Sequence, residues 1–499
     1  MSEMSLAVVG QAGTTRRDTR RSLLLAETLV GLVAVAARLP GVWGQPFWED
    51  EVASARILRE PTIPLMLHRI GQTESTPPLW YLIAWLGHHA GAPLQDERLL
   101  SVVFGGLLSA AAVRLAVRFV PLRLAVFVGL LTAVGGEFVW HGHELRAYEL
   151  LALLAASFGL CLLAELEAPS RWREFRLAAV VVAGGSTHYF FGFGVAAALI
   201  WLWLDPGARR IRRRASAALV LGAAVALCWA PLALTQSRGN RFWWIGHFQF
   251  RTVLAVPLRL FTGAYSGQAI GLTLSLTTFA VLVIGSARLG RRSAAGRLVG
   301  ALAVGPILLS AAVWAAGPPI FDFRNLIGVG PFVAVGLAAA IEGLPGRTPL
   351  GLLATLSAAA ILVALALTGE HRIPAYDAIA KSLVHSGWTG TQPIAVYGDP
   401  SLYRTPLEWY LPDHPVLDIA RPLPHACTTV YVIERSGTVR VVHQQRPPTS
   451  HLKRVRLLVQ RGKHPQCSAL IAPRHPPAVA QSRPRVGTAS VTTNGVRRA

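Results

Sequence analysis

The chain is poor in charged residues and especially poor in lysine. Only 15% of its 499 residues are charged and 52% are hydrophobic, whereas roughly a quarter of a soluble domain is charged. This apolar excess excludes a disordered chain, and four cysteines are too few for a disulfide scaffold. Basic residues outnumber acidic ones by 48 to 26, but the clustered arginines lie mostly between apolar stretches or near the C-terminal end. The composition predicts an integral membrane protein that binds no nucleic acid.

Several familiar site motifs are also missing. The sequence has no HExxH or CxxC pattern that would hold zinc, no GxxxxGK[ST] loop and no GxGxxG turn after a strand. A metal centre and a cytoplasmic nucleotide-driven mechanism therefore lack a supporting motif, although a divalent cation stays open as a cofactor. We interpret the histidines of the outer loops as structural or interfacial, and keep only His188 as a secondary candidate.

Long apolar runs are frequent instead. A bilayer core of about 30 Å is crossed by about 20 residues of helix. The run at 177–204 is long enough for two short spans with a tight turn near His188. The sequence therefore predicts an all-α polytopic membrane protein with about eleven transmembrane helices. The runs lie near residues 22–42, 99–117, 122–140, 147–166, 177–204, 217–235, 268–287, 298–316, 326–342 and 350–368.

Arginine clusters occur in alternate connections between these runs, and short loops rich in arginine face the cytoplasm. This pattern puts residues 1–21 in the cytoplasm as an N-terminal tail of a multi-pass plasma-membrane protein. We interpret the first run as a retained helix because it has no clear small-residue cleavage site. An odd number of spans then places the C-terminal part outside. The clusters are Arg16–Arg21, Arg114–Arg123, Arg171–Arg176, Arg209–Arg214, Arg288–Arg297 and Arg347.

Two outer loops carry aromatic residues. The first, residues 43–98, is rich in carboxylates, tryptophan and proline, and its apolar piece Pro77–Leu86 is too short to span a membrane. Such a tryptophan- and tyrosine-containing piece is typical of a helix at the membrane interface. The second, residues 236–266, has a similar pattern around Trp243 and Trp244. We expect both loops to belong to a transmembrane catalytic domain at residues 22–368.

The hydropathy falls after residue 368. Residues 369–474 predict a small exterior α/β domain, and residues 475–499 a disordered tail. Cys427 and Cys467 fall in this domain and could pair, whereas the cysteines of the spans should stay reduced. The expected strands are Ile394–Tyr397 and Thr429–Ile433, and the expected helices are Ala375–Val384 and Leu402–Tyr410.

Three adjacent carboxylates, Glu49, Asp50 and Glu51, follow the first span directly. Mutual repulsion and an aromatic surrounding would both raise a carboxyl pKa, which suits a proton acceptor. The alternative is a solvated helix start, because Asp50 precedes a plausible helix at 51–60 and acidic residues favour that end. Spacing alone leaves the two interpretations equal.

Arginines at other outer helix starts bear on this choice. Arg98 precedes the second span, Arg146 lies in the crowded turn before the fourth, and Arg324 opens a later one. A single arginine at the headgroup level usually only anchors its helix. Several on the same side as a carboxylate cluster are more typical of a phosphate-binding site.

In their order and sidedness these features resemble the GT-C glycosyltransferases that use polyprenyl-phosphate sugars. The groups most similar belong to family 39: the protein O-mannosyltransferases, the aminoarabinose transferases of lipid A and Rgt-like bacterial enzymes. The resemblance covers residues 22–368. One departure is the segment Glu74-Ser75-Thr76 before the prolines, where relatives often have His, Asp or Lys preceding the proline, so the resemblance does not carry over donor-phosphate contacts from this loop. The features are Trp48–Glu51, Pro77–Tyr81, Arg98–Gly106 and Glu144–Tyr148.

The resemblance implies a GT-C-like fold and an inverting transfer of a sugar to an acceptor hydroxyl at the outer face. The family's base maps onto Asp50, with Glu51 as its neighbour. Arg98 and Arg146 are similar to residues that hold the donor phosphate, and Arg324 would add positive charge where the leaving phosphate becomes negative. Further candidates for substrate contact are Glu49, Glu144, Tyr148 and His188.

The sequence thus predicts a membrane glycosyltransferase whose partners are a lipid-linked sugar donor and a glycan, lipid or protein acceptor. One alternative is a lipid or glycan transporter, or a flippase, without transferase chemistry. Such proteins place polar groups near the bilayer midplane, whereas here the ionisable residues crowd the exterior ends of helices, with Glu149, about one turn inside the fourth span, as the main exception. The other alternative is a non-catalytic assembly or receptor protein, which leaves the Glu49–Glu51 cluster without a role.

Overall fold

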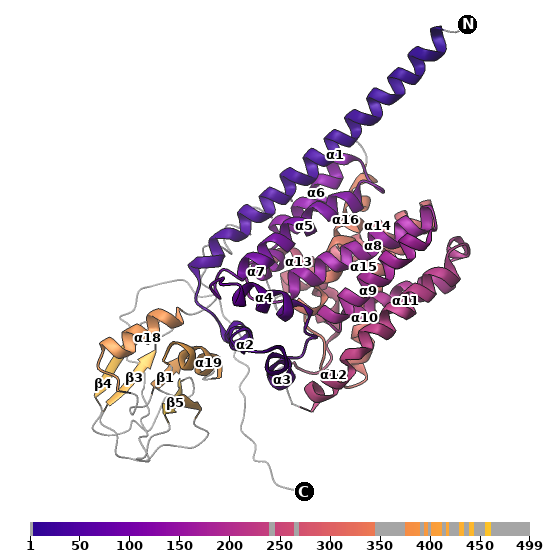
Figure 1. Ribbon diagram of the computed structural model, residues 1–499. Coiled ribbons are helices and arrows are strands. Elements are labelled where there is room, and N and C mark those ends of the chain that lie inside the picture. The colour runs from indigo at the N-terminus through magenta and orange to yellow at the C-terminus, as the bar shows by residue number, and fades with distance from the viewer. Residues whose placement is uncertain are drawn as a thin grey trace. The chain divides into compact units, whose positions relative to one another are not determined.

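The structure is a computed structural model, and it falls into two units, Met1–Asp377 and Ala378–Ala499. Unit 1 is almost entirely helical (Figure 1). The described residues are 3–238, 245–263, 269–344, 375–389, 394–397, 401–411, 416–418, 429–433, 439–443 and 455–460.

Seven helical segments in the described residues are long and apolar enough to cross a membrane. Two shorter apolar helices, α6 (Leu122–Val134) and α10 (Phe191–Leu204), accompany them. The prediction of a polytopic membrane protein is therefore confirmed, and the predicted run at 350–368 lies outside the described residues. The seven segments are Arg20–Gly44, Arg98–Ala116, Tyr148–Glu167, Arg212–Ser237, Gly271–Arg292, Ala294–Ala315 and Arg324–Glu342.

The helices that build these segments follow the apolar runs closely. The long run at 177–204 is divided into α9 and α10 by a turn at His188, as predicted. Their bounds are α1 (Glu3–Gly44), α5 (Arg98–Ala116), α8 (Tyr148–Glu167), α9 (Arg171–Thr187), α11 (Arg212–Ala226), η2 (Leu227–Trp229), α12 (Ala230–Ser237), α14 (Ala269–Arg292), α15 (Ala294–Ala315), η3 (Arg324–Val329) and α16 (Gly330–Glu342), with η1 (Pro206–Ala208) between α10 and α11.

One predicted run is wrong as a single helix. The run at 122–140 breaks at Gly135, which has extended backbone, and a short helix α7 (Gly136–His141) follows in a new direction. A Cβ on Gly135 would lie 2.5 Å from the carbonyl oxygen of Leu131, and one on Gly136 would lie 2.6 Å from the backbone nitrogen of Gly263. The break therefore uses two glycines because neighbouring backbone leaves no room for a side chain.

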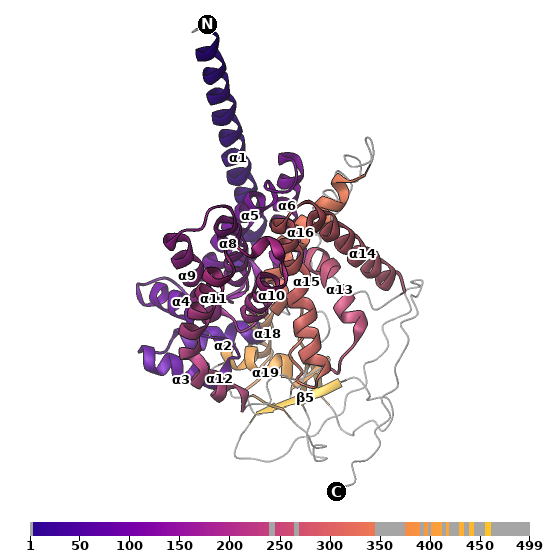
Figure 2. The ribbon, with the colours of Figure 1, turned by 90° about the vertical axis from the view of Figure 1, so that its right-hand side faces the viewer.

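Helix α1 lies alongside α5 and α6, as Figures 1 and 2 show. The packing of α1 on α5 is close, because a Cβ on Gly31 would lie 3.2 Å from the carbonyl oxygen of Gly106. In Figure 2, α9 and α11 lie on one side of unit 1 and α13 and α14 on the other. This packing brings the C-terminal end of α1 beside the first residue of α5, Arg98.

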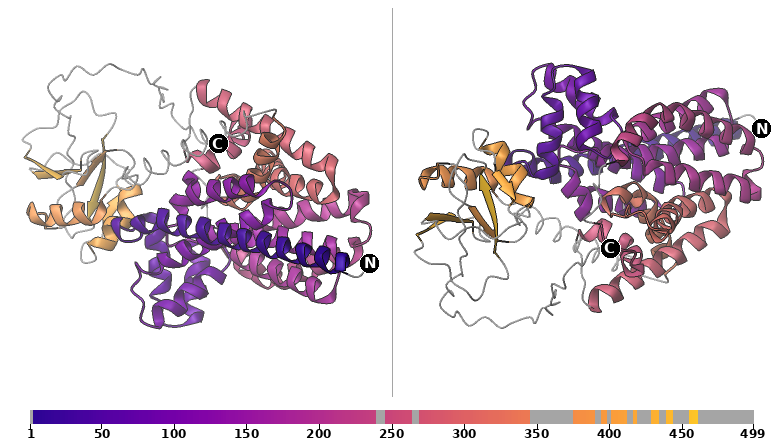
Figure 3. Two further views of the ribbon diagram at one scale, coloured as in Figure 1. Left: turned by 90° about the horizontal axis from the view of Figure 1, so that it is seen from above. Right: turned by 90° about the horizontal axis from the view of Figure 1, so that it is seen from below.

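The predicted outer loop 43–98 contains three helices, α2 (Glu49–Leu58), α3 (Ile63–Thr73) and α4 (Leu79–His89). They form the violet cluster beside the longer helices in Figure 3. Helix α4 contains most of the piece expected at the interface, but its Trp80 and Tyr81 are buried in protein. The predicted second outer loop contains α13 (Phe250–Thr262), which buries Val253 and Leu260 and exposes Phe250.

Unit 2 contains a five-stranded mixed sheet in the order β2-β5-β1-β3-β4. Strand β1 pairs in parallel with β3 and antiparallel with β5. The predicted α/β character is therefore confirmed, while Cys427, Cys467 and residues 475–499 lie outside the described residues. The strands are β1 (Ile394–Tyr397), β2 (Val416–Asp418), β3 (Thr429–Ile433), β4 (Val439–His443) and β5 (Val455–Gln460), and the nearby helices are α18 (Tyr376–His385) and α19 (Ser401–Tyr410).

Candidate active site

A buried ion pair fixes the start of α2. The Arg98 Nε and Nη2 atoms donate to the two carboxylate oxygens of Glu51 at 2.7 and 2.6 Å, and both side chains are only 1% exposed. The remaining guanidinium donors reach the carbonyl oxygens of Val42, Gln45 and Pro46. All five N–H groups of Arg98 are thus in use. Arg98 and Glu51 therefore hold the loop between α1 and α2 and present no unused donor for a ligand.

Asp50 points elsewhere than Glu51. Its Oδ2 atom accepts a hydrogen bond from Nη1 of Arg324 at 2.6 Å, and its side chain is 26% exposed. Helix α2 begins at Glu49 with Trp48 as N-cap, so Asp50 lies inside the first turn. The three carboxylates still lie near the positive end of the helix dipole. The cap interpretation therefore does not describe Asp50, whose carboxylate is paired with an arginine distant in sequence.

The pKa of Asp50 differs from the sequence-based expectation, which was wrong in sign. Burial by itself would raise this pKa, as expected. The charges of Arg324 and then Arg146 outweigh burial and hold the pKa of Asp50 below its ordinary value. Asp50 is consequently an ionised carboxylate at neutral pH.

Arg146 is anchored by one end of its guanidinium. Its Nη1 atom donates to Glu74 at 2.7 Å and to the Tyr81 hydroxyl at 3.1 Å, with Ser54 Oγ at 3.2 Å. Within the described part of the chain, Nε and Nη2 of Arg146 make no hydrogen bond. An arginine held at one nitrogen can offer its other edge to two oxygens of an anion.

A cavity of about 310 Å³ lies beside these groups. This volume is at the lower end of the range for small-molecule sites, roughly 300–1,000 Å³. The ring of Tyr148 lies between the two arginines, 5.9 Å from the Arg146 guanidinium carbon and 6.0 Å from that of Arg324. The cavity is lined by Ser75, Thr76, Arg146, Tyr148, His188, Tyr189, Phe190, Phe193, Ile320, Arg324 and Asn325.

His188 contributes a neutral group to this cavity. Burial, and then the charges of Arg146 and Arg324, lower the pKa of His188 to about 3. Its Nδ1 atom accepts a hydrogen bond from the backbone N–H of Phe190 at 3.2 Å. The ring is therefore an uncharged hydrogen-bonding group beside two cations.

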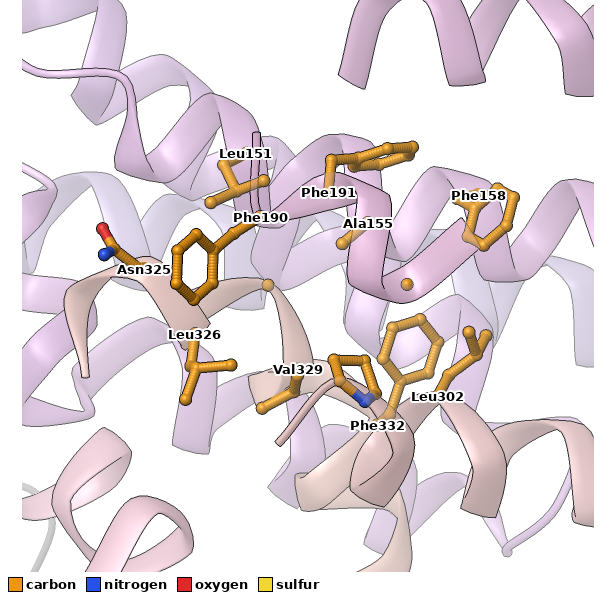
Figure 4. A pocket seen from close by; sticks show the side chains of 13 residues that line it. Leu151, Ala155, Phe158, Phe190, Phe191, Leu302, Asn325, Leu326, Val329 and Phe332 are labelled. Atoms are coloured by element: carbon orange, nitrogen blue, oxygen red, sulfur yellow. The ribbon is translucent and has the colours of Figure 1, made fainter. Parts of the chain in front are cut away.

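A second, apolar pocket adjoins the first. Its volume is about 30 Å³, and it shares Phe190 and Asn325 with the larger cavity. Figure 4 shows Asn325 at one end and Phe158, Leu302 and Phe332 at the other, between the helices. The two pockets therefore place polar and cationic groups next to an apolar wall.

Glu144 lies behind the cavity. Its Oε2 atom is 2.7 Å from Nδ1 of His141, whose Nε2 atom lies 3.2 Å from Oε2 of Glu137. Burial would lower the pKa of His141, but Glu144 and Glu137 raise it to about 9. A buried imidazolium thus bridges two carboxylates and supports the loop that carries Arg146.

The predicted site residues therefore separate into two groups. Tyr148, His188, Arg146 and Arg324 line one cavity, and Asp50 contacts Arg324 at that cavity. Glu51, Arg98 and Glu144 pack behind it, and Glu49 lies half-buried in the first turn of α2. Asp322, two residues before Arg324, was not identified from the sequence as the second ion-pair partner of Arg324. Glu74 had been noted only as a departure from the family pattern, and it is the carboxylate that anchors Arg146.

The described residues contain no set of side chains placed to ligate a metal ion. Among the described residues, no group of three or more His, Cys, Asp or Glu side chains is arranged to hold an ion.

Comparisons with known proteins give structural neighbours only. No family model matches the chain, and no curated protein matches it significantly. The chain is similar to ArnT from Cupriavidus metallidurans in the apo state, with 15% identity over 77% of this chain and 74% of that chain and a TM-score of 0.48. The same protein bound to undecaprenyl phosphate gives 15% identity, 78% and 74% coverage and a TM-score of 0.47. The archaeal oligosaccharyltransferase AglB from Archaeoglobus fulgidus, in complex with an inhibitory peptide and a dolichol-phosphate, gives 13% identity, 73% and 58% coverage and a TM-score of 0.43.

Proposed function

We propose that the protein is a membrane glycosyltransferase that moves a sugar from a polyprenyl-phosphate donor to an acceptor hydroxyl at the outer face of the plasma membrane. The observation that carries this proposal is that two arginines line one cavity and that one of them, Arg324, is ion-paired with the carboxylate of Asp50. Asp50 contacts Arg324 at 2.6 Å, and Arg146 and Arg324 line the cavity together.

The two arginines suit an anionic headgroup. Arg146 has Nε and Nη2 available among the described residues, and guanidinium groups bind phosphate oxygens in pairs. The adjoining pocket, of about 30 Å³, is too small to enclose a hydrocarbon chain, but its apolar wall suits contact with the hydrocarbon part of the same molecule. A phosphate ester attached to a lipid satisfies both surfaces, whereas a soluble sugar nucleotide would use only the polar one.

Asp50 suits the role of proton acceptor. In the proposed step, an acceptor oxygen forms a bond to the anomeric carbon while the bond from that carbon to the phosphate oxygen breaks. The acceptor proton passes to the Asp50 carboxylate, and the electron pair of the broken bond stays on the departing polyprenyl phosphate. The displacement inverts the anomeric configuration. Arg146 and Arg324 stabilise the charge that grows on the phosphate, so a second carboxylic acid is not required.

The remaining predicted groups have supporting roles in this scheme. Tyr148 and His188 line the cavity and would contact the sugar or the phosphate. Glu51 and Arg98 hold the Asp50 turn in place through their buried ion pair. In this proposal, that structural role replaces the donor-phosphate role that the family resemblance implied for Arg98. The arginine-rich loops still orient the N-terminus to the cytoplasm and unit 2 to the exterior in this proposal.

A transporter has less support. Glu149, inside one span, is paired at 3.2 Å with Arg38, which lies inside another, and both side chains are fully buried. Arg38 also donates to the carbonyl oxygens of Ala34, Thr132 and Ala133. This pair therefore joins helices in the interior and lines neither pocket described above.

The test is a reaction with purified full-length protein in lipid vesicles. Polyprenyl phosphates carrying different labelled monosaccharides are offered with an extract of envelope glycans, lipids and proteins from a strain lacking the gene. We expect acceptor-dependent release of polyprenyl phosphate and transfer of label from one of the sugars. Movement of an intact sugar-lipid across the bilayer, without cleavage, would support the transporter instead.

A further inference from the structure

Arg324 is shared between two carboxylates. Its Nη1 atom contacts Asp50 at 2.6 Å, and its Nε atom contacts Asp322 at 2.9 Å. The Arg324 side chain is 22% exposed and lines the cavity. The guanidinium is therefore held at one edge by a neighbour in sequence and at the other by the proposed base.

The carboxylates that contact the two cavity arginines already outnumber them, three to two, before a ligand binds. Arg146 faces Glu74, and Arg324 faces both Asp50 and Asp322. A phosphate diester would add a further negative charge to this set. Because an isolated anion is costly in a partly buried site, the phosphate needs cationic contacts. Arg146 can offer its Nε and Nη2 edge, and a contact from Arg324 as well would compete with the carboxylates that this guanidinium now contacts. The Arg324 contact with Asp50 is the more exposed of the available pairs, since Arg146 and Glu74 are 9% and 4% exposed.

We propose that the donor phosphate and Asp50 compete for Arg324, so that donor binding releases the Asp50 carboxylate for proton abstraction. This inference rests on the proposed function and adds that donor binding precedes activation of the base. While Arg324 donates to Asp50, the ion pair stabilises the charged carboxylate and makes it a weaker proton acceptor. When Nη1 turns to the phosphate, Asp322 still holds the guanidinium through Nε and keeps it at the cavity. The base thus becomes stronger once the donor is in place, so that activation of the acceptor follows donor binding.

The other charged groups near Asp50 allow this exchange. Arg146 and His141 add positive charge near Asp50, and Glu144 adds negative charge. The Tyr148 hydroxyl also interacts electrostatically with Asp50. Arg146 donates only to the backbone oxygen of Asp50, at 3.4 Å, and not to its carboxylate. Asp50 therefore keeps a favourable environment for its negative charge after Arg324 leaves, but loses its direct side-chain hydrogen bond.

Measuring how variants bind a phosphate distinguishes the proposed competition from an Arg324 whose contact with Asp50 does not change. Farnesyl phosphate serves as the probe, and its affinity for the purified full-length protein in detergent micelles is measured by titration calorimetry. Asp50→Asn should bind farnesyl phosphate about fivefold more tightly than the parent, because the competing carboxylate is gone. Asp50→Ser is a second variant that removes the same charge in a different shape. The matched control is Glu60→Gln, which removes a carboxylate paired with Arg69 away from the cavity lining.

The outcomes separate this inference from the proposed function. Tighter binding by both Asp50 variants, with Glu60→Gln unchanged and Arg324→Gln at least tenfold weaker, supports the competition. Unchanged or weaker binding by the Asp50 variants, with Arg324→Gln still weakened, overturns the competition and leaves the phosphate site intact. Parent-like binding by Arg324→Gln and by Arg146→Gln overturns both proposals, because no arginine would then hold the phosphate.

Discussion

Arg146 gives the sharpest quantitative prediction, because its role can be divided between stability and binding. The change is Arg146→Met, which keeps the length of the stem and removes the charge. It removes the 2.7 Å contact of Arg146 with Glu74, which is 3% exposed, and the hydrogen bond that the Tyr81 hydroxyl accepts from Arg146 at 3.1 Å. Removing one partner of a buried pair costs about 3–5 kcal/mol. We expect the free energy of unfolding to fall by about that amount.

A second substitution separates the two roles. In Arg146→Met with Glu74→Gln, the stranded carboxylate is gone, so most of the lost stability should return, with a coupling energy of about 2–3 kcal/mol. Phosphate binding should not return, because the Nε and Nη2 donors of Arg146 are absent in both variants. Glu74→Gln alone should bind farnesyl phosphate at least as well as the parent.

The assay is reversible unfolding by SDS in mixed micelles, combined with calorimetric titration of farnesyl phosphate. A double variant no more stable than Arg146→Met would show that the pair with Glu74 is not what stabilises this region. A double variant that binds the phosphate like the parent would show that Arg146 serves the fold alone.

Three further predictions concern the surroundings of the site. His141, with its pKa raised to about 9, should contribute stability that is complete below about pH 6.5 and is lost as the pH rises through 9. The difference in unfolding free energy between the parent and His141→Asn should therefore shrink over that pH range. A constant difference would contradict the imidazolium bridge. Gly105→Ala should destabilise by about 1–3 kcal/mol because its Cβ would lie 2.4 Å from Nε of Arg38, whereas Gly192→Ala, with open space around it, should not destabilise; equal stabilities would contradict the packing of Arg38. Glu51→Gln should lower the unfolding free energy by about 3 kcal/mol or more and slow transfer, because buried Arg98 keeps its charge and loses its partner; a stable, fully active variant would show that this pair does not hold the Asp50 turn.

The membrane organisation could be predicted from the sequence because it depends on local features. Apolar runs of sufficient length became helices, and the turn near His188 was visible as a polar interruption. The break at Gly135 was missed because two glycines in an apolar run do not end a helix by themselves. The close approach of Gly263, distant in the sequence, decides it.

The site was only partly predictable, since contacts between distant segments decide each role. Asp50 and Glu51 are adjacent in sequence, but successive residues of a helix point about 100° apart. Glu51 consequently meets Arg98, 47 residues away, and Asp50 meets Arg324, 274 residues away. The sequence showed arginines at three helix starts, but it held no signal for which of them lines a cavity. The lowered pKa of Asp50 follows from the same distant contact and could not be foreseen from the carboxylate cluster.

The most direct test of the central claim is a single-turnover measurement with donor already bound, which separates the chemical step from binding. The rate of polyprenyl phosphate release after adding acceptor is compared between the parent, Asp50→Asn and the control Glu60→Gln. Loss of a general base costs about 10²–10⁴-fold, so Asp50→Asn should retain the donor but transfer at least 100-fold more slowly, while Glu60→Gln reacts like the parent. A transfer rate of Asp50→Asn within a few-fold of the parent would contradict the assignment of Asp50 as the base.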